Sequence, residues 1–174
     1  RDPVADVRKQ AAWALGQVQS HESLEALGAA LRDSDAEVRA QSAWALGQIE
    51  DAGSAGPLEG ALRDTDNDVK KNAAWALGQL NLRRIPAGLL TAFGDGNADV
   101  RQTAAWAAGQ IEDPAAIPGL TKLLTDADRD VQKNALWALS QIDDPHALDG
   151  ITKLLQSNDP ELRRMAVQAL GRDH

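Results

Sequence analysis

The sequence predicts an all-α solenoid, an α-solenoid of about five and a half two-helix repeats. Three observations support this prediction. The five-residue sequence Trp-Ala-Leu-Gly-Gln recurs at a constant interval along the chain, which is typical of stacked supersecondary units. Apolar residues recur at helical spacing along the whole chain. No segment shows the alternating apolar and polar pattern of a half-buried strand.

The five-residue sequence lies in the first helix of each repeat. Its copies are residues 13–17, 44–48, 75–79, 106–110 and 137–141. All five tryptophans of the protein occupy its first position, and the sixth repeat has Gln168 there. Two copies differ from the others at one position each, because Ala108 replaces the leucine and Ser140 replaces the glycine. The repeats therefore align without a gap.

The second helix of each repeat is predicted from apolar residues at the spacing i, i+3, i+6 and i+7. In the first repeat these are Leu24, Leu27, Ala30 and Leu31. The repeats begin near residues 1, 32, 63, 94, 125 and 156. We interpret residues 1–174 as a single solenoid domain, and as a fragment of a longer protein because the sequence opens inside a repeat. In such an array each repeat buries its apolar face against the next.

The turns carry residues that begin and end helices. An Asp or Asn precedes each first helix from the second repeat onward, where its side chain can accept a hydrogen bond from a backbone N–H. These residues are Asp35, Asp66, Asn97, Asp128 and Asp159. We expect the glycine of the five-residue sequence to end the helix or nearly end it. Residues 51–57 are poor helix formers and predict a short or late second helix, and residues 82–86 also break the repeat consensus.

The tryptophans are predicted to lie on the polar side of the first helix. On a helical wheel of about 100° per residue, the residues within about 60° of Trp13 are Asp6, Lys9, Gln10, Gly16 and Gln17. The alanine, leucine and valine residues lie on the other side and form the predicted buried face. A large apolar ring on a polar face, repeated five times, indicates a binding surface.

The repeat pattern resembles a known family. The pattern D-x-D-x-[DE]-V-R-x-x-A-A-x-A-L-G-x-I-x-D-P is clearest at residues 128–145 and 35–51. It resembles the short HEAT-like repeat of phycobilin lyases and of many bacterial scaffold proteins, and the resemblance covers the whole chain. Artificial helical-repeat binders of this type bind through variable positions of the first helix. The resemblance implies that these positions are Lys9, Gln10, Trp13, Gln17 and their equivalents.

A looser resemblance is to the importin-type armadillo repeat, in which a W-x-x-x-N pair holds an extended peptide. This chain has W-x-x-x-Q five times, so glutamine replaces asparagine. Each unit is also predicted to have two helices rather than three. The resemblance implies a groove with aromatic rings and amide donors.

We predict a non-enzymatic scaffold that binds a protein or peptide on a concave face formed by the first helices. Indole faces hold apolar groups or Lys and Arg side chains, and amides both donate to and accept from a peptide backbone. An acidic row beside the rings favours an extended, basic peptide. The predicted binding residues are the rings Trp13, Trp44, Trp75, Trp106 and Trp137, the amides Gln17, Gln48, Gln79, Gln110 and Gln141, the second amide row Gln10, Gln41, Asn72 and Asn134, and the acids Glu37, Asp68, Asp99 and Asp130.

Several alternatives stay open at this stage. The rings can instead pack between repeats, each across a neighbouring helix. The array can handle a bilin chromophore, as the resemblance to phycobilin lyases implies. It can also be a structural or sensory domain of a larger bacterial protein. An exposed row of rings also permits self-association.

Composition and missing motifs narrow the function classes. The formal net charge of −8 argues against a nucleic-acid partner, because phosphate binding needs a basic surface. No apolar run approaches the length of about 20 residues that spans a membrane, and no signal peptide is visible. We therefore expect a soluble, cytoplasmic protein without membrane contact through this segment. The absence of cysteine, of a phosphate loop and of a nucleophile with its base leads us to expect no catalysis, no cofactor and no metal.

Two further patterns have structural interpretations. The acid-rich residues 126–130 resemble the opening of a calcium loop, but Val131 stands where that loop needs glycine. We therefore interpret these acids as helix caps. A basic residue recurs early in the first helix and is expected to pair with turn carboxylates. This set is Arg8, Arg39, Lys70, Arg101 and Arg163.

Overall fold

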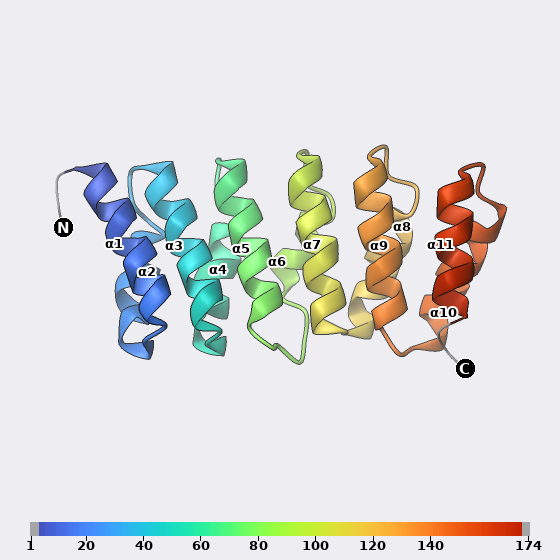
Figure 1. Cartoon of the computed structure of the whole chain (residues 1–174), viewed down its shortest axis with the longest axis horizontal. Helices are drawn as coiled ribbons and strands as arrows, with labels where there is room; N and C mark the ends of the chain where they lie inside the picture. The colour runs from blue at the N-terminus through green and yellow to red at the C-terminus, as the bar shows by residue number, and fades with distance from the viewer. Residues whose placement is uncertain (1–3, 172–174) are drawn as a thin grey trace. The chain divides into compact units, whose positions relative to one another are not determined.

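The computed structural model describes residues 4–171, which form eleven α-helices and four short 3-10 helices, with no strand among them (Figure 1). The predicted all-α solenoid of two-helix repeats is confirmed. The chain divides into two compact units. One comprises Arg1–Leu82 with Pro86–Leu89, and the other comprises Arg83–Ile85 with Leu90–His174.

The first unit has two layers of helices. The first helices of its three repeats pack side by side in one layer: α1 (Ala5–Val18), α3 (Ala36–Ile49) and α5 (Asn67–Gln79). The second helices form the other layer, and each follows a 3-10 turn: η1 (His21–Ser23) with α2 (Leu24–Ala30), and η2 (Ala52–Ser54) with α4 (Ala55–Ala61). Each second helix packs against the first helix of the next repeat, α2 against α3 and α4 against α5.

The second unit repeats this arrangement. Its first helices are α7 (Ala98–Ile111), α9 (Arg129–Gln141) and α11 (Pro160–Leu170). Its second helices are α8 (Ile117–Leu123), which follows η3 (Pro114–Ala116), and α10 (Pro145–Lys153), which precedes η4 (Leu154–Gln156). Here α9 packs against α7, α8, α10 and α11. The short helix α6 (Ala87–Ala92) contributes residues to both units.

The buried face of the first helix is the one that the helical wheel predicts. The valine near the start of the helix is at most 1% exposed in the four repeats that follow the first: Val38, Val69, Val100 and Val131. The alanine after each tryptophan is fully buried in the same repeats: Ala45, Ala76, Ala107 and Ala138. Small residues at this position let neighbouring first helices approach closely.

The predicted N-caps are confirmed. The side chain of Asp35 accepts hydrogen bonds from the backbone N–H groups of Glu37 and Val38, at 2.9 and 3.1 Å. Asp66, Asp128 and Asp159 each accept from two backbone N–H groups in the same way, and Asn97 accepts from the N–H of Val100 alone. Helix α1 differs because its N-cap, Val4, has no side chain that can accept a hydrogen bond.

The prediction for residues 51–57 is wrong. Helix α4 has seven residues, as many as α2 and α8. Asp51 begins the preceding 3-10 turn by accepting a hydrogen bond from the N–H of Gly53 at 2.7 Å. Pro57 lies in the first turn of α4, where a missing N–H removes no intrahelical hydrogen bond. The break at residues 82–86 is confirmed, because α6 has only six residues.

The glycines of the five-residue sequence lie in the last turn of the helix but do not end it. Helices α1 and α3 continue to Val18 and Ile49, and the residues that end them are Gln19 and Glu50. These two residues adopt the left-handed conformation, with φ of 51° and 56°. The end of the helix therefore does not explain why glycine occurs at positions 16 and 47, two residues before the last helical residue.

Candidate functional site

The tryptophans lie where first helices meet, and each keeps part of its ring at the surface. Trp13 is 52% exposed, and the other four are half-buried. A Cβ atom added to Gly16 would lie 3.2 Å from Cζ3 of Trp44 and 2.8 Å from Cβ of Ala45. The ring of Trp44 therefore packs over the preceding helix at the point where that helix has no side chain.

The same contact recurs in both units. A Cβ on Gly47 would lie 2.6 Å from Cζ3 of Trp75, and a Cβ on Gly109 would lie 2.5 Å from Cζ3 of Trp137. Real Cβ atoms do not approach other atoms this closely, so the glycine is required by the ring of the next repeat and by the backbone behind it. The rings of Trp44, Trp75 and Trp137 thus pack between repeats, and part of each tryptophan stays accessible to solvent.

The sequence contains a signal for this contact, because the glycine of one repeat and the tryptophan of the next are always separated by the same number of residues. Each tryptophan after Trp13 has a glycine at the same offset in the preceding repeat, and these glycines are Gly16, Gly47, Gly78 and Gly109. In the sixth repeat Gln168 replaces the tryptophan, and the residue at that offset before it is Ser140. Ring and glycine are therefore replaced together. Sequence reasoning missed this pair because it assigned the glycine to the end of the helix.

The amides predicted to bind a ligand differ in their surroundings. Gln17 and Gln110 are exposed, whereas Gln48, Gln79 and Gln141 are half-buried. In the second amide row, Gln10 is exposed and Gln41 is half-buried. The remaining two members of that row donate to backbone carbonyls.

These two donors contribute to the fold. Asn72 donates to the carbonyl of Ala40 in the preceding repeat at 3.0 Å, and Asn134 donates to the carbonyl of Asp130 at 2.9 Å. Each amide group has a second N–H and an oxygen, so half of its donor capacity is used in this way. The row therefore helps to join and shape the helices.

The predicted acids are exposed, and lysines of the same face offset part of their charge. The exposed acids are Glu37, Asp68, Asp99 and Asp130. Lys9 forms an ion pair with Glu37 of the next repeat, and this carboxylate raises the pKa of Lys9. Lys71 pairs with Asp68 at 2.8 Å, and Lys133 pairs with Glu161 of the next repeat at 3.3 Å.

Each unit keeps an excess of acids in this row. In the first unit Asp6, Glu37 and Asp68 face two lysines, because Ala40 stands at the lysine position of the second repeat. In the second unit Asp99, Asp130 and Glu161 face Lys133 and Arg164, because Gln102 stands at that position of the fourth repeat. The excess of acids in this row is therefore the same in the two units.

At the start of the first helices, arginines join consecutive repeats, as the sequence predicts. Arg8 donates to both carboxylate oxygens of Asp33, each at 2.8 Å. Arg39 does the same to Asp64 at 2.7 and 2.9 Å. Arg101 binds both oxygens of Asp126, at 2.8 and 2.7 Å. We call these pairs the Arg–Asp rungs.

The rungs hold the carboxylates in their charged form. Hydrogen bonds from Arg8 lower the pKa of Asp33 to about 2, against the partial burial of the carboxylate, which acts in the other direction. Arg39 and Arg101 likewise lower the pKa of Asp64 and Asp126. These side chains are only 10–19% exposed, so the pairs are shielded from solvent more than ordinary surface ion pairs.

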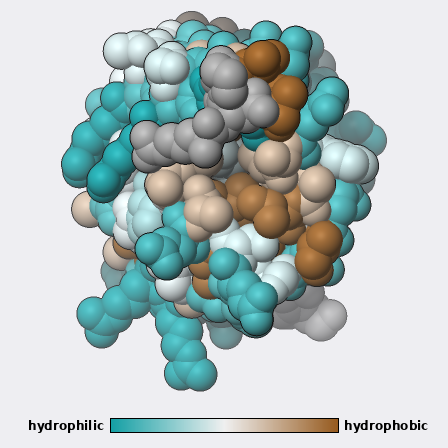
Figure 2. Space-filling view, turned by 90° about the vertical axis from the view of Figure 1, so that its left-hand side faces the viewer, coloured by the Kyte–Doolittle hydropathy of each residue, from teal (hydrophilic) through white to brown (hydrophobic). Residues whose placement is uncertain are grey.

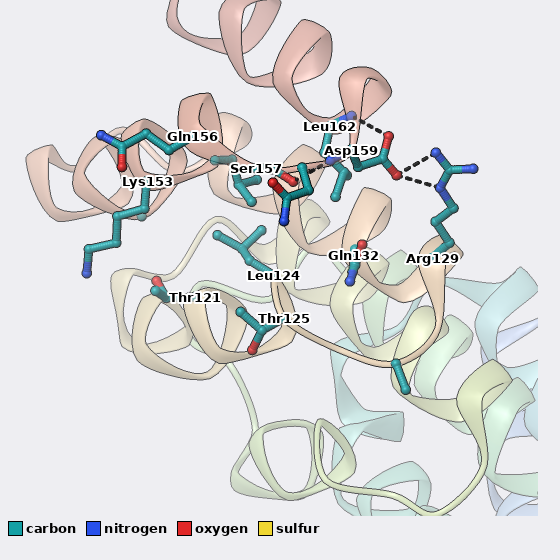
Figure 3. Close-up of a pocket in the computed structure, with 14 residues that line it drawn as sticks. Thr121, Leu124, Thr125, Arg129, Gln132, Lys153, Gln156, Ser157, Asp159 and Leu162 are labelled. Carbon is teal, nitrogen blue, oxygen red and sulfur yellow. Dashed lines mark hydrogen bonds and ion pairs between the residues drawn. The ribbon is translucent and has the colours of Figure 1, made fainter.

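The rung is absent between the fifth and sixth repeats, where Gln132 and Ser157 take the positions of the Arg and the Asp. A cavity of about 680 Å³ lies there, lined by residues of α8 to α11 and their turns (Figure 3). At its edge Arg129 donates to Asp159 at 2.7 Å. The amide of Gln132 donates to the carbonyl of Asp126 at 2.6 Å, the kind of contact that Arg101 makes with the carbonyl of Asp95.

A second cavity borders the last ring. It has a volume of about 570 Å³ and is lined by Trp137, Ser140, Met165 and Gln168 among others. It lies where the sixth repeat has a glutamine in place of a tryptophan. The indole ring of Trp137 and the flexible thioether of Met165 both border this cavity.

Among residues 4–171, no group of three or more His, Cys, Asp or Glu side chains is placed to hold a metal ion. The two histidines of this range each lie beside one carboxylate, His21 beside Asp51 and His146 beside Asp144. In the same range no helix is both long and apolar enough to cross a lipid bilayer.

Comparison with known proteins agrees with this geometry. The model of HEAT repeats matches residues 1–78, 55–126 and 85–171. Among solved structures, the chain is similar to the complex of CpcE and CpcF of phycocyanin lyase from Nostoc sp. PCC7120. The sequence identity is 26% and the TM-score 0.73, over 98% of this chain and 73% of that chain.

Two artificial proteins are similar as well. An engineered protein shares 25% identity at a TM-score of 0.70, over 98% of this chain and 91% of that one. A designed armadillo repeat protein in complex with peptide (KR)4 shares 23% identity at a TM-score of 0.71, over 100% of this chain and 96% of that one. No curated protein matches the chain. The fold is thus that of a repeat solenoid resembling a phycocyanin lyase subunit and designed peptide-binding repeat proteins.

Proposed function

Because the chain belongs to the family of HEAT-repeat proteins, we propose that it is a non-catalytic scaffold whose units bind extended, basic peptide segments along the tryptophan face. The observation that carries this proposal is the position of the rings. The rings of Trp44, Trp75 and Trp137 pack on the preceding helix of their own unit yet stay partly exposed, so they are held rigid in the position of a binding surface. Rigid aromatic side chains lose little conformational entropy when a ligand binds.

The charge of the face supports a basic ligand. Acids outnumber the Lys and Arg residues beside the rings in both units, and the acids except Glu161 are exposed. A Lys or Arg side chain placed over an indole face contributes about 0.5–2 kcal/mol, and a neighbouring carboxylate adds attraction that salt screens. The amides of Gln17 in the first unit and Gln110 in the second are exposed and supply donors and acceptors for a peptide backbone.

The chain itself offers a substitution that tests this proposal. The sixth repeat has Gln168 at the tryptophan position, so Trp→Gln replaces a ring by a residue that the repeat already accommodates. We propose the double variant Trp106→Gln/Trp137→Gln and the peptide (KR)4 as probe, with calorimetry to measure binding. Loss of two cation–π contacts should weaken binding about 10-fold or more.

The control is Leu90→Gln, which removes an exposed apolar side chain of α6 that lies outside the tryptophan row. This variant should bind (KR)4 as the unchanged protein does. Circular dichroism should show the same helix content in all three proteins. Unchanged affinity in the double variant, with intact helices, would remove the rings from the binding surface.

A second candidate function rests on the similarity to the phycocyanin lyase complex, which spans 98% of the chain. In this alternative the tryptophan face and the cavity beside Trp137 would hold a bilin. Added bilin should then quench the tryptophan fluorescence and change its own absorption band. If (KR)4 binds and bilin changes neither signal, the peptide-binding function is favoured.

A further inference from the structure

The cavity between the fifth and sixth repeats is large enough to hold a small molecule. Its volume of about 680 Å³ falls within the range of about 300–1,000 Å³ that is typical of small-ligand sites. It lies where Gln132 and Ser157 replace the Arg–Asp rung, and all of its lining residues belong to the second unit. None of the described residues that line it is a tryptophan. The cavity is therefore a different surface from the one proposed to bind peptides.

The cavity has a net positive lining, although the chain as a whole has a formal net charge of −8. Its charged lining residues are Arg129, Lys153 and Asp159, which are two cations and one acid. Arg129 donates to Asp159 at 2.7 Å, so these two charges offset each other (Figure 3). Lys153 is exposed and forms no ion pair with the residues that the structure describes. One positive charge is therefore available to a ligand.

A hydroxyl group with unused hydrogen-bonding capacity lines the same cavity. Figure 3 shows the Lys153 side chain extending from α10 towards α8, where Thr121 lies. Thr121 is half-buried, and its hydroxyl forms no hydrogen bond with another residue of the described range. The hydroxyl oxygen lies 3.0 Å from the position that a Cβ on Gly150 would take, so α8 and α10 approach closely at this wall. An ammonium and a hydroxyl are therefore both left to bind an anion.

The rest of the lining supplies an amide and apolar side chains. Gln132 uses one N–H of its amide on the carbonyl of Asp126, at 2.6 Å, which leaves one N–H and the amide oxygen. Leu124 and Leu154 line the cavity as well. The cavity thus combines a positively charged, polar part with an apolar part, which is the composition that a ligand with one charged group and an apolar body requires.

We propose that this cavity binds a small organic acid. The carboxylate lies at Lys153 and Thr121, and the apolar body lies against Leu124 and Leu154. An ammonium and a hydroxyl both donate to a carboxylate, and hydrogen bonds between charged groups are stronger than those between neutral ones. The apolar body removes leucine surface from water. This site goes beyond the proposed function, because it binds an acid on one surface while the tryptophan face binds a basic peptide on another.

The probes that test this proposal are phenylbutyrate and its neutral amide, phenylbutyramide, which share one apolar body and differ in charge. The chain is titrated with each compound at millimolar concentration, and nitrogen–proton correlation spectra locate and measure binding. Phenylbutyrate should shift the backbone signals of Thr121, Gly150 and Lys153 progressively to saturation. The amide should bind about 5-fold more weakly or less, because it lacks the charge that Lys153 attracts.

Two variants and a matched control test the assigned residues. Lys153→Gln should weaken phenylbutyrate binding about 5-fold or more, and Thr121→Val, which keeps the shape of the side chain, about 2-fold or more. Lys122→Gln is the control, because it removes an exposed lysine at the equivalent position of the preceding repeat, outside the cavity lining. It should leave phenylbutyrate binding unchanged. All three variants should keep their helix content and bind (KR)4 as the unchanged protein does.

Exposed apolar surface elsewhere on the chain is a competing place for the probes to adsorb. Helix α1 exposes Val7 and Val18, at 45% and 70%, and Figure 2 shows apolar residues gathered on this end of the molecule between hydrophilic ones. Such a surface would bind the acid and the amide equally, since it contacts only the apolar body that they share. Shifts confined to α1, with equal affinity for the two compounds, would contradict the proposal.

Three further outcomes would overturn it. The first is the absence of any saturable shift with phenylbutyrate, and the second is unchanged affinity in Lys153→Gln. The third concerns the source of the carboxylate, which an acetylated and amidated Phe-Glu dipeptide presents on a peptide instead of a small acid. Tighter binding of this dipeptide than of phenylbutyrate at the same signals would assign the site to an acidic side chain of a protein. None of these outcomes decides the proposed function, because binding of (KR)4 is measured separately.

Discussion

Two neighbouring interfaces of the second unit differ in a way that shows what fixes the spacing of the repeats. Between the fourth and fifth repeats, the ring of Trp137 packs over Gly109, and Arg101 binds Asp126 with both donors. Between the fifth and sixth repeats, the ring, the glycine and the Arg–Asp rung are all replaced. That interface has cavities of about 680 and 570 Å³ on its two sides.

The comparison indicates that the ring–glycine contact and the rung act together. The rung joins the start of one first helix to the turn before the next, and the ring joins the opposite end of the same two helices. When both are present, neighbouring helices are held at both ends. When both are missing, the helices still pack through their alanines and leucines, and space remains on either side.

The largest expected effect comes from filling the glycine. In Gly109→Ala the new Cβ would lie 2.5 Å from the ring of Trp137 and 2.9 Å from the Cα of Ala138. Because backbone cannot yield as a flexible side chain does, we expect a loss of about 2–3 kcal/mol in the free energy of unfolding. Urea denaturation followed by circular dichroism measures it.

The sixth repeat supplies the control for this change. Gly109→Ser combined with Trp137→Gln reproduces the natural pair of Ser140 and Gln168. The double variant should be more stable than Gly109→Ser alone. Equal stability of the two would show that the ring is not what excludes a side chain at this position.

Acid should weaken the interfaces that have rungs. The pKa of Asp33 is lowered from 3.8 to about 2 in the folded protein, so its contribution is fully present above pH 4. As the pH falls from 4 to 2 the carboxylate takes up a proton and the contribution is lost, on the order of 2 kcal/mol. Unfolding measured at several pH values should show this loss, and Arg8→Gln should remove most of it. A variant with the same acid dependence as the unchanged protein would contradict the assignment.

Removing one Arg–Asp rung should lower the free energy of unfolding by a smaller amount than the preceding changes. Arg101→Gln leaves the carboxylate of Asp126, which is 10% exposed, without its bidentate partner. We expect a loss of about 1–2 kcal/mol, between the values for surface pairs and for fully buried ones. Thermal unfolding measures the difference. Arg129→Gln is the matched control, because the Arg129 side chain is 56% exposed, and it should change stability by less.

The smallest expected effect is an increase in the free energy of unfolding. Gln132→Arg with Ser157→Asp would install the rung that the last interface lacks and occupy part of its cavity. Exposed or partly exposed pairs contribute about 0–1 kcal/mol, so we expect stabilisation in that range. Each single change should give less than the pair. A pair that stabilises no more than the sum of its parts would show that no rung forms.

Much of the fold follows from the sequence because the repeat period is fixed. Each first helix from the second repeat onward has an Asp or Asn as its cap, as Asp35 shows, and a buried face of valine, alanine and leucine at helical spacing. The pairing of Arg39 with a turn carboxylate follows from the recurrence of both residues. These features depend on local geometry, which a helical wheel represents well.

What the sequence analysis missed depends on contacts between repeats. The reason for Gly16 lies in the ring of Trp44 in the next repeat, and a wheel of one helix cannot show it. The wheel placed the tryptophans among polar residues, but it could not show that the next helix covers part of each ring. The second helix of the second repeat follows a 3-10 turn that Asp51 caps, and it forms although its composition alone predicts a poor helix.

The most direct test of the binding surface is a titration of the chain with (KR)4, observed through the five indole N–H signals in a nitrogen–proton correlation spectrum. Single Trp→Gln variants assign each signal. If the tryptophan face binds the peptide, the indole signals of Trp106 and Trp137 should shift progressively and saturate. If (KR)4 binds while every indole signal stays in place, the rings serve only to pack one repeat on the next.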